Sequence, residues 1–296
     1  MSNTLGAHME AELYSQPEMW RKVTELDNSC LPTNGERVVV IGCGTSWFMA
    51  MAYAAMREAA GQGLTDAFTA TEVPMDREYD VAIVITRSGT TSEIIDYLTK
   101  VKGTVRTIAL LGAQDTPVAE LADDVVNLEF ADEQSVVQTR FATTALSFLR
   151  GSVHGKQAVL DAADQAAEVL QTEPEAELIN AEQYSFLGLG WVYGVAIEAG
   201  LKMRESCQAW TESYQSMEYR HGPIAIAAPG RITWQLGTSP EGLAEQVKAT
   251  GARYEDVDRD PLAQLVRVHQ VALLTARARG LNPDEPRNLT RSVILK

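Results

Sequence analysis

The sequence has few cysteines, no long apolar run and no leader-like segment, and each shortage excludes a class of protein. Its three cysteines, Cys30, Cys43 and Cys207, are scattered without a CxxC pair. They predict reduced thiols in a cytoplasmic protein, and neither a disulfide framework nor a metal site. Charged residues interrupt the apolar runs well before the ~18 residues that a membrane span needs. The segment Met1–Trp20 lacks the basic stretch and apolar core of a secretory signal.

Basic residues are scarce beside acidic ones. The 296 residues include 25 Lys and Arg against 40 Asp and Glu, which gives a net charge of −15. This balance gives little support to a nucleic-acid-binding face, and it requires local groups to hold any anionic small molecule. The length predicts about two domains.

The most informative stretch is Val81–Glu93, VAIVITRSGTTSE. Val81–Ile85 has the composition of a buried parallel strand, and a helix is expected to open at Ser92. Between them, Thr86–Thr91 supplies four hydroxyls, an arginine and a glycine where a helix N-terminus exposes free N–H groups. This combination favours an anion site, and phosphate is the obvious anion. The alternative is that the hydroxyls only cap the helix, although one hydroxyl would be enough for that.

Strands alternate with helices from Arg37 to Leu149, and this pattern predicts a parallel, doubly wound sheet. Ligands of such sheets lie at the carboxyl ends of the strands, near the switch point. Both Gly42–Ser46 and Thr86–Thr91 are expected at such ends, where Thr45 adds a further hydroxyl. Trp47 occupies the third glycine position of a GxGxxG pattern, so a dinucleotide is not expected, and no other cofactor is predicted.

A second copy of the unit is expected in the other half, because Gly42 and Gly188, like Gly44 and Gly190, are 146 residues apart. We therefore predict an α/β fold of two tandem αβα sandwich domains with flavodoxin-like parallel sheets, the second shorter. The expected boundaries are a helical arm at 1–30, a first domain at 31–154 and a second at 155–296. Pro17 is expected to divide the arm into two helices.

A second informative segment is Ala196–Pro223. Lys202 and Glu205 are spaced i,i+3 and share a helical face. Such a pair is commonly a solvated surface pair, but the small and apolar residues around it indicate a packed helix. His221 follows, its backbone fixed by Gly222 and Pro223. A carboxylate with a histidine is what enolisation of a sugar phosphate requires, since one group opens the ring and another moves a proton between C1 and C2.

The chain resembles the sugar isomerase (SIS) domain family, and specifically the two tandem domains in the isomerase half of glucosamine-6-phosphate synthase. The resemblance covers nearly the whole chain. It depends on five segments: GCGTS (42–46), TRSGTT (86–91), DEQSVVQTRFATTAL (132–146), ESYQSMEYRHGP (212–223) and DEPRNLTRSV (284–293).

The resemblance implies a role for each matching residue. Glu205 would be the base for the C1/C2 proton shift, with Lys202 near it, and His221 would open the ring. In the family this histidine can come from the neighbouring subunit, so a homodimer with a shared active site is expected. The residues that would hold the sugar phosphate or line its site are Thr45, Thr86, Arg87, Ser88, Thr91, Val137, Gln138 and Arg291.

Two departures from the synthase pattern limit the expected activity. Ser2 stands where the synthase has a nucleophilic cysteine, and no glutaminase domain is expected, so glutamine-driven synthesis is not predicted. Arg291 replaces a lysine that forms a Schiff base with the ketose, and a guanidinium cannot form that imine.

The sequence thus predicts a cytoplasmic phosphosugar isomerase or amino-sugar-6-phosphate deaminase that acts on a hexose 6-phosphate by enolisation. Its only expected partners are the small-molecule substrate and a second copy of the chain; neither nucleic acid nor a membrane is expected. A deglycase acting on a sugar phosphate joined to an amino acid would use the same chemistry. A non-catalytic phosphosugar-binding regulatory protein is the alternative from another class.

Overall fold

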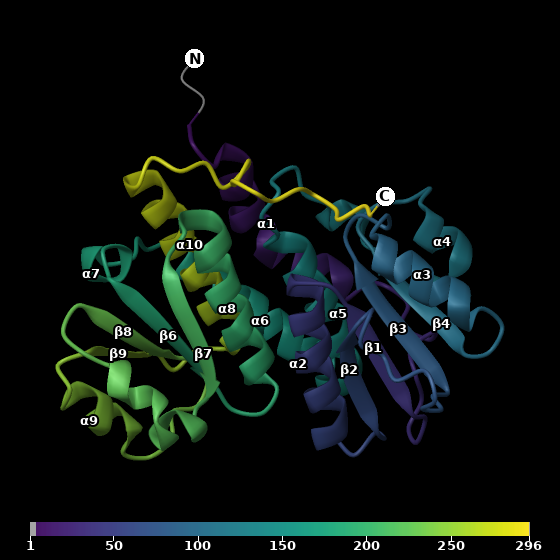
Figure 1. The fold of residues 1–296 in the computed structure, drawn as a ribbon, viewed down its shortest axis with the longest axis horizontal. Coiled ribbons are helices and arrows are strands. Elements are labelled where there is room, and N and C mark those ends of the chain that lie inside the picture. The colour runs from purple at the N-terminus through teal and green to yellow at the C-terminus, as the bar shows by residue number, and fades with distance from the viewer. Residues whose placement is uncertain (1–3, 296) are drawn as a thin grey trace. The chain divides into compact units, whose positions relative to one another are not determined.

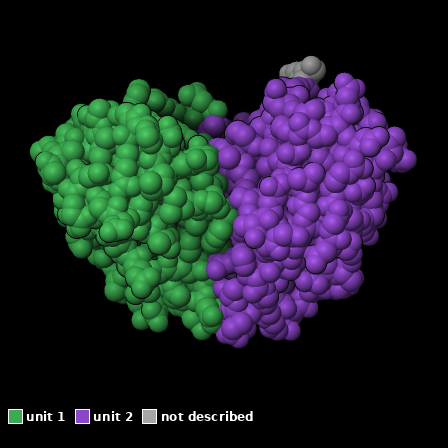
Figure 2. Space-filling model, turned by 90° about the horizontal axis from the view of Figure 1, so that it is seen from below, with its two compact units in different colours: residues 1–17, 134–139, 161–288 green, residues 18–133, 140–160, 289–296 purple. Residues whose placement is uncertain are grey.

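The computed structural model describes residues 4–295, which divide into two compact units (Figure 2). Of the described residues, unit 1 comprises 4–17, 134–139 and 161–288, and unit 2 comprises 18–133, 140–160 and 289–295. The sequence-based boundaries at residues 30 and 154 stay a prediction. Ser2 lies outside the described residues.

Unit 2 contains a five-stranded parallel sheet in the order β2-β1-β3-β4-β5 (Figure 1). Strands β1 and β3 are apolar and buried along their whole length, as the interior strands of a parallel sheet are. This strand order is that of flavodoxin-like doubly wound folds, whose switch point lies between β1 and β3. The elements are β1 (Val38–Gly42), α2 (Thr45–Ala59), β2 (Thr65–Thr69), β3 (Val81–Thr86), α3 (Ser92–Val101), β4 (Arg106–Leu111), α4 (Pro117–Leu121), β5 (Asp124–Asn127), a 3₁₀ turn (Glu129–Ala131) and α5 (Arg140–His154).

Helices cover both faces of this sheet (Figure 1). Helices α3 and α4 bury Ile94, Leu98 and Val118 against apolar side chains of β1, β3 and β4. Helices α2 and α5 pack against each other, and α2 also packs on β1. The α/β class with parallel sheets, expected from the sequence, is confirmed.

Helix α1 (Ala7–Val23) is one continuous helix that contains Pro17, so the expected break is wrong. Proline removes one backbone donor and leaves the carbonyl four residues earlier without its partner. That carbonyl belongs to Leu13, and the side-chain amide of Gln16 donates to it at 3.5 Å. Burial of Met9, Leu13 and Trp20 holds the helix together around the proline.

Unit 1 contains a four-stranded parallel sheet in the order β7-β6-β8-β9, the same relative order as β2-β1-β3-β4. Helix α8 packs on β6 and β7 and against α10, and Leu243 and Val247 of α9 belong to a separate apolar cluster with Leu187. The elements are α6 (Lys156–Val169), α7 (Ala176–Ile179), β6 (Gln183–Gly188), α8 (Val192–Cys207), β7 (Trp210–Gln215), two 3₁₀ turns (Glu218–His221, Pro223–Ile226), β8 (Arg231–Gln235), α9 (Leu243–Lys248), β9 (Arg253–Asp256) and α10 (Pro261–Ala278).

The turns after β1 and β6 have the same geometry. A Cβ atom on Gly42 would lie 2.3 Å from the Ser46 carbonyl carbon, and one on Gly188 would lie 2.4 Å from the Val192 carbonyl oxygen. Two residues later, Gly44 and Gly190 have φ of +55° and +54°. This match supports an internal repeat, while a tandem of domains with a shorter second member stays a prediction.

Three further findings hold within residues 4–295. No helix there combines the length and the apolar character needed to cross a membrane. No group of three or more His, Cys, Asp or Glu side chains in that range is placed to hold a metal ion. The cysteines are free thiols, and burial raises the pKa of Cys207 to about 11, so this thiol is protonated at neutral pH.

The glycine turns generate a test of stability. We expect G42A and G188A each to lower the free energy of unfolding by about 3 kcal/mol, because the new methyl group overlaps backbone atoms that cannot move aside. G151A, in α5, is the matched control: its Cβ would make only an ordinary contact, 3.6 Å from Val159 Cγ2, and alanine is favoured over glycine inside a helix by about 1 kcal/mol, so no loss is expected. Urea denaturation measures the free energy of unfolding of all three variants. Equal losses would contradict the predicted overlap at Gly42 and Gly188.

Candidate functional site

The hydroxyl-rich turn lies at the switch point of the unit 2 sheet. Thr86 ends β3, and Thr45 begins α2 just beyond the end of β1, the neighbouring strand. Thr45, Thr86 and Ser88 are all buried, and Thr91 precedes the first turn of α3 without capping it. Gly89 has φ of +63°, and a Cβ there would lie 2.2 Å from Thr116 Oγ1, so only glycine fits. The fold thus places four of the predicted phosphate ligands after the carboxyl ends of β1 and β3, two neighbouring strands.

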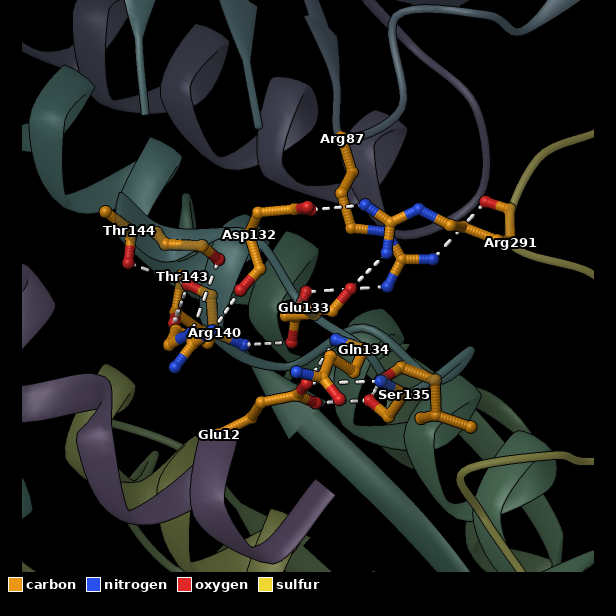
Figure 3. Close-up of polar contacts among 12 residues, drawn as sticks. Glu12, Arg87, Asp132, Glu133, Gln134, Ser135, Arg140, Thr143, Thr144 and Arg291 are labelled. Carbon is orange, nitrogen blue, oxygen red and sulfur yellow. Dashed lines mark hydrogen bonds and ion pairs between the residues drawn. The ribbon is translucent and has the colours of Figure 1, made fainter. Parts of the chain in front are cut away.

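Arg87, the other predicted ligand in this turn, is paired with a carboxylate (Figure 3). Its Nη1 lies 3.6 Å from Glu133 Oε2, and the two side chains are only 2% and 0% exposed. Its Nη2 donates to the carbonyl of Arg291 at 3.3 Å. A buried ion pair of this kind leaves a costly uncompensated charge if one partner is removed. Arg87 therefore has a structural role in the turn, and its contact with a phosphate stays a prediction.

The C-terminal residues 291–293 lie against the same turn. The hydroxyls of Ser88 and Thr90 both donate to Ser292 Oγ at 3.1 Å. The Ser92 N–H, at the start of α3, donates to the carbonyl of Val293 at 3.2 Å. Ser292 Oγ and the Val293 carbonyl thus accept the hydrogen bonds that the two hydroxyls and the Ser92 N–H would otherwise donate to an anion at the helix N-terminus.

The Arg291 side chain binds the segment between β5 and α5. Its Nη2 lies 2.5 Å from Asp132 Oδ1, and its Nη1 donates to the carbonyl of Glu133. Glu133 in turn accepts from the backbone N–H of Arg140 at 2.7 Å, at the start of α5. Arg291, which stands where the synthase pattern has a lysine, thus anchors the C-terminal segment of unit 2.

Residues 134–139 belong to unit 1 and contain two predicted site residues. The Glu12 carboxylate of α1 accepts the backbone N–H groups of Gln134 and Ser135 at 2.5 and 3.1 Å (Figure 3). Val137 is buried, and its carbonyl accepts from the Ser135 hydroxyl. The Oε1 atom of Gln138 is buried with no hydrogen-bond partner in the described part of the chain.

Lys202, Glu205 and Glu198 form a cluster on α8. The motif analysis did not identify Glu198. The Lys202 side chain is 0% exposed, and its Nζ contacts Glu205 Oε2 and lies 3.5 Å from Glu198 Oε1. Glu198 is 1% exposed, whereas Glu205 is 20% exposed. Among these three groups, Glu205 is the one that a ligand can reach.

His269 of α10 borders this cluster. Burial, with a further contribution from the Lys202 charge, lowers the pKa of His269 to about 3, so its ring is neutral. The side-chain amide of Gln16 lies 3.2 Å from its Nδ1. Because the amide N–H donates there, the ring proton is on Nε2, which has no hydrogen-bond partner among the described residues.

The structure does not bring His221 to Glu205 within one chain. Glu205 lies in the last turn of α8, directly before β7, and His221 lies in an exposed 3₁₀ turn that follows β7. A strand of six residues spans roughly 20 Å. Glu205 therefore lies near the amino end of β7, and His221 lies beyond its carboxyl end. The ring of His221 has no hydrogen bond or ion pair in the part of the chain that the structure describes.

Sequence reasoning missed four side chains that hold these groups, Glu133, Glu198, His269 and Ser292. Only Glu198 had a usable signal, since it precedes Lys202 by four positions and must share its helical face. The other three contacts join residues more than 40 positions apart.

The sequence comparisons agree with the fold. Residues 33–150 match the family model described as SIS domain. The glutamine–fructose-6-phosphate aminotransferase (isomerizing) of Gloeobacter violaceus is 26% identical over 319 aligned positions, which cover 88% of this chain and 52% of that protein. The chain thus spans about half the length of the curated relatives it matches.

Solved structures of different activities share the fold. Glucosamine-6-phosphate deaminase from Thermotoga maritima superposes with a TM-score of 0.81 at 24% identity, covering 98% of this chain and 100% of that one. Tagatose-6-phosphate ketose/aldose isomerase from Escherichia coli gives 0.78 at 18% identity, with 98% and 96% covered. These likenesses establish the architecture without choosing among activities. What the comparisons establish for this chain is therefore a match to the SIS domain model over residues 33–150 and the fold of these solved structures.

Proposed function

We propose that this protein is an enzyme that enolises a hexose 6-phosphate, as an aldose–ketose isomerase or as a deaminase of an amino-sugar 6-phosphate. The observation that carries the proposal is the α8 cluster, in which a buried ammonium holds a partly exposed carboxylate, that of Glu205. A charged lysine in the core is costly unless paired, and this one supports the carboxylate that a substrate can reach.

The phosphate is assigned to the turn after β3. Thr45, Thr86, Ser88 and Thr91 supply hydroxyls at the carboxyl ends of β1 and β3 and the start of α3, a combination suited to phosphate oxygens. Binding of phosphate there would displace the C-terminal residues Ser292 and Val293, which now contact Ser88, Thr90 and the Ser92 N–H. Arg87 adds positive charge to the turn, although Glu133 already balances part of it. Val137, Gln138 and Arg291 are assigned to the walls that contact the sugar.

The chemistry is assigned to His221 and Glu205. His221 transfers a proton between O5 and O1 and opens the ring to the aldehyde. Glu205 then removes the C2 proton; the C–H electron pair forms the C1=C2 bond, the C1=O pair moves to O1, and O1 takes a proton from water, which gives the enediol or enolamine. Return of the proton from Glu205 to C1, with loss of a proton from O2 or N2 to water, gives the ketose, or an imine at C2 in an amino sugar. Water hydrolyses that imine to the ketose and ammonia.

We further propose that the working enzyme is a cytoplasmic homodimer in which His221 serves the site of the partner. The position of His221 and Glu205 at opposite ends of β7 supports this, because one substrate cannot reach both within a chain. A C2 dimer would bring each histidine to the carboxylate of the other copy.

Turnover tests the proposed reaction. We expect the protein to convert glucosamine 6-phosphate or a hexose 6-phosphate to a ketose, and E205Q to lower kcat about 10²–10⁴-fold because it removes the base. Ammonia and ketose assays follow the reaction, and calorimetry on E205Q follows binding. Conversion of a hexose 6-phosphate to its ketose, with neither ketose nor ammonia formed from glucosamine 6-phosphate, would eliminate the deaminase. Binding without turnover in the unmodified protein would favour the regulatory alternative.

A mixing experiment tests the shared site. E205Q and H221A are each expected to be inactive, and subunit exchange between them should restore about a quarter of the native activity, because half of the dimers then contain one intact site. Sedimentation establishes the oligomeric state in the same samples. No recovery after verified exchange, or full activity of a monomer, would overturn the assignment of His221 to the partner.

A further inference from the structure

A groove of about 540 Å³ lies in unit 2, at the amino ends of the strands. Three of its residues stand where a strand is about to begin: Arg37 directly precedes β1, Tyr79 comes two positions before β3, and Val105 directly precedes β4. Strand β3 has six residues and spans roughly 20 Å. The groove and the hydroxyl-rich turn after β3 therefore lie at opposite ends of this strand.

The floor of the groove is apolar. Val73, Tyr97 and Val101 are buried and belong to the apolar core beneath α3, and Val105 packs against the same core. Met75, which is exposed, lines the groove as well. Pockets that bind small molecules have volumes of about 300–1,000 Å³ and combine apolar walls with a few polar groups. This groove has the size and the apolar floor of such a pocket.

One polar group in this floor lacks a partner. Tyr97 is 4% exposed, and no residue among 4–295 forms a hydrogen bond with its hydroxyl. Burial, with the neighbouring Tyr79 as a second cause, raises the pKa of Tyr97 to about 12, so the hydroxyl keeps its proton at neutral pH. A tyrosine hydroxyl in a buried position usually has a hydrogen-bond partner. The Tyr97 O–H can therefore donate to a molecule in the groove.

A second donor lies on the same face of α3. Lys100 comes three residues after Tyr97, and residues at this spacing are neighbours on a helix. Its side chain lines the groove and forms neither an ion pair nor a hydrogen bond with the part of the chain that the structure describes. A lysine in the last turn of a helix also interacts favourably with the helix dipole. That interaction does not use its three N–H donors, which stay available to a ligand.

The two arginines of the groove already have carboxylate partners. Arg37 Nη2 lies 3.3 Å from Asp80 Oδ1, and its Nη1 lies 3.4 Å from Glu78 Oε2. Arg77 Nη1 lies 2.6 Å from Asp66 Oδ2. Because these pairs engage both guanidinium groups, the polar end of a ligand is assigned to the two donors on α3.

We propose that this groove binds a small carboxylate with an apolar body. The carboxylate accepts hydrogen bonds from the Tyr97 hydroxyl and the Lys100 ammonium, and the body covers the apolar floor. Two neighbouring donors, one of them charged, match the two oxygens of a carboxylate. The inference goes beyond the proposed enolisation and does not depend on it, since the groove lies at the other end of the strands.

Water is the alternative occupant of the groove. If the groove is only hydrated surface, a water molecule accepts from the Tyr97 hydroxyl, and an organic carboxylate has no preferred position there. Replacing Tyr97 by phenylalanine separates the two cases, because it keeps the ring in the core and removes only the hydroxyl.

The experiment is a calorimetric titration of the full chain with 2-naphthoate, a carboxylate with an apolar body. We expect saturable binding with a Kd on the order of 1 mM or below. Y97F should weaken binding about tenfold, because a hydrogen bond to a charged group is lost. K100Q should weaken it about threefold, because an exposed ion pair contributes less. The uncharged 2-naphthalenemethanol, which has the same rings, should bind about tenfold more weakly than 2-naphthoate.

Two controls accompany the titration. K102Q removes an exposed lysine two positions further along, which does not line the groove, and we expect native affinity. Y97F removes a hydroxyl that has no partner within the described residues, so its urea denaturation midpoint should equal that of the native protein, which shows that the variant is folded.

Three results would overturn the proposal. The first is no saturable binding, the second is a native Kd in both Y97F and K100Q, and the third is displacement of 2-naphthoate by glucosamine 6-phosphate, which would place the probe at the phosphate turn. Losses in Y97F and K100Q that K102Q lacks would support it. The titration needs no turnover, so its result and that of the enolisation assay are independent.

Discussion

The fully buried ammonium of Lys202 is the constraint around which unit 1 is built. An ion removed from water is stable only beside opposite charge, and α8 supplies that charge from the positions four before and three after it. The same helix packs closely on β7, where Ser213 donates to the carbonyl of Ala196 at 2.9 Å and a Cβ on Gly200 would lie 2.7 Å from Ser213 Oγ. Burial, with the Lys202 charge as a second cause, lowers the pKa of His269 to about 3, so its ring stays neutral. The carboxylate that pairs with Lys202 and is partly exposed is that of Glu205.

The glycine turns after β1 and β6 have the same geometry, but the candidate residues lie at different ends of the strands in the two sheets. They follow the carboxyl ends of the strands in unit 2 and precede the amino end of β7 in unit 1. In unit 2, the glycine turn after β1 leads to Thr45 and Ser46, and the hydroxyls gather at the carboxyl edge of the sheet. In unit 1, the equivalent turn leads to Trp191 and Val192, which offer no hydroxyl. The candidate chemistry lies instead at the last turns of α8, before β7. The two copies of the repeat thus have the same turn geometry but different side chains after the glycines.

The sequence predicted the features that depend on local pattern. The apolar run Val81–Ile85 identified the central strand, and the turn residues after it located the hydroxyl cluster at the switch point. Strand β7 was missed, because WTESYQ is an edge strand without the alternating apolar residues that burial imposes. The predicted helix break at Pro17 was wrong, because the side-chain amide of Gln16 donates to the Leu13 carbonyl in place of the missing backbone N–H.

The long-range contacts that complete the candidate site could not be predicted from local sequence patterns. Glu133 meets Arg87 from 46 positions away, and Ser292 meets Ser88 across 204. Such pairs are set by how strands and termini are assembled, and residue spacing along the chain carries no record of them. Whether Arg291 contacts a sugar depends on the same long-range anchoring to Asp132 and Glu133.

The central claim is that a carboxylate moves a proton between C1 and C2 of a sugar phosphate. Its most direct measurement is the reaction in D₂O with a hexose 6-phosphate that the protein converts, followed by ¹H NMR of the ketose. Glu205 is 20% exposed, so its proton exchanges with solvent, and the account predicts deuterium on C1 of the product. A ketose that carries only the original hydrogen after complete conversion would contradict it.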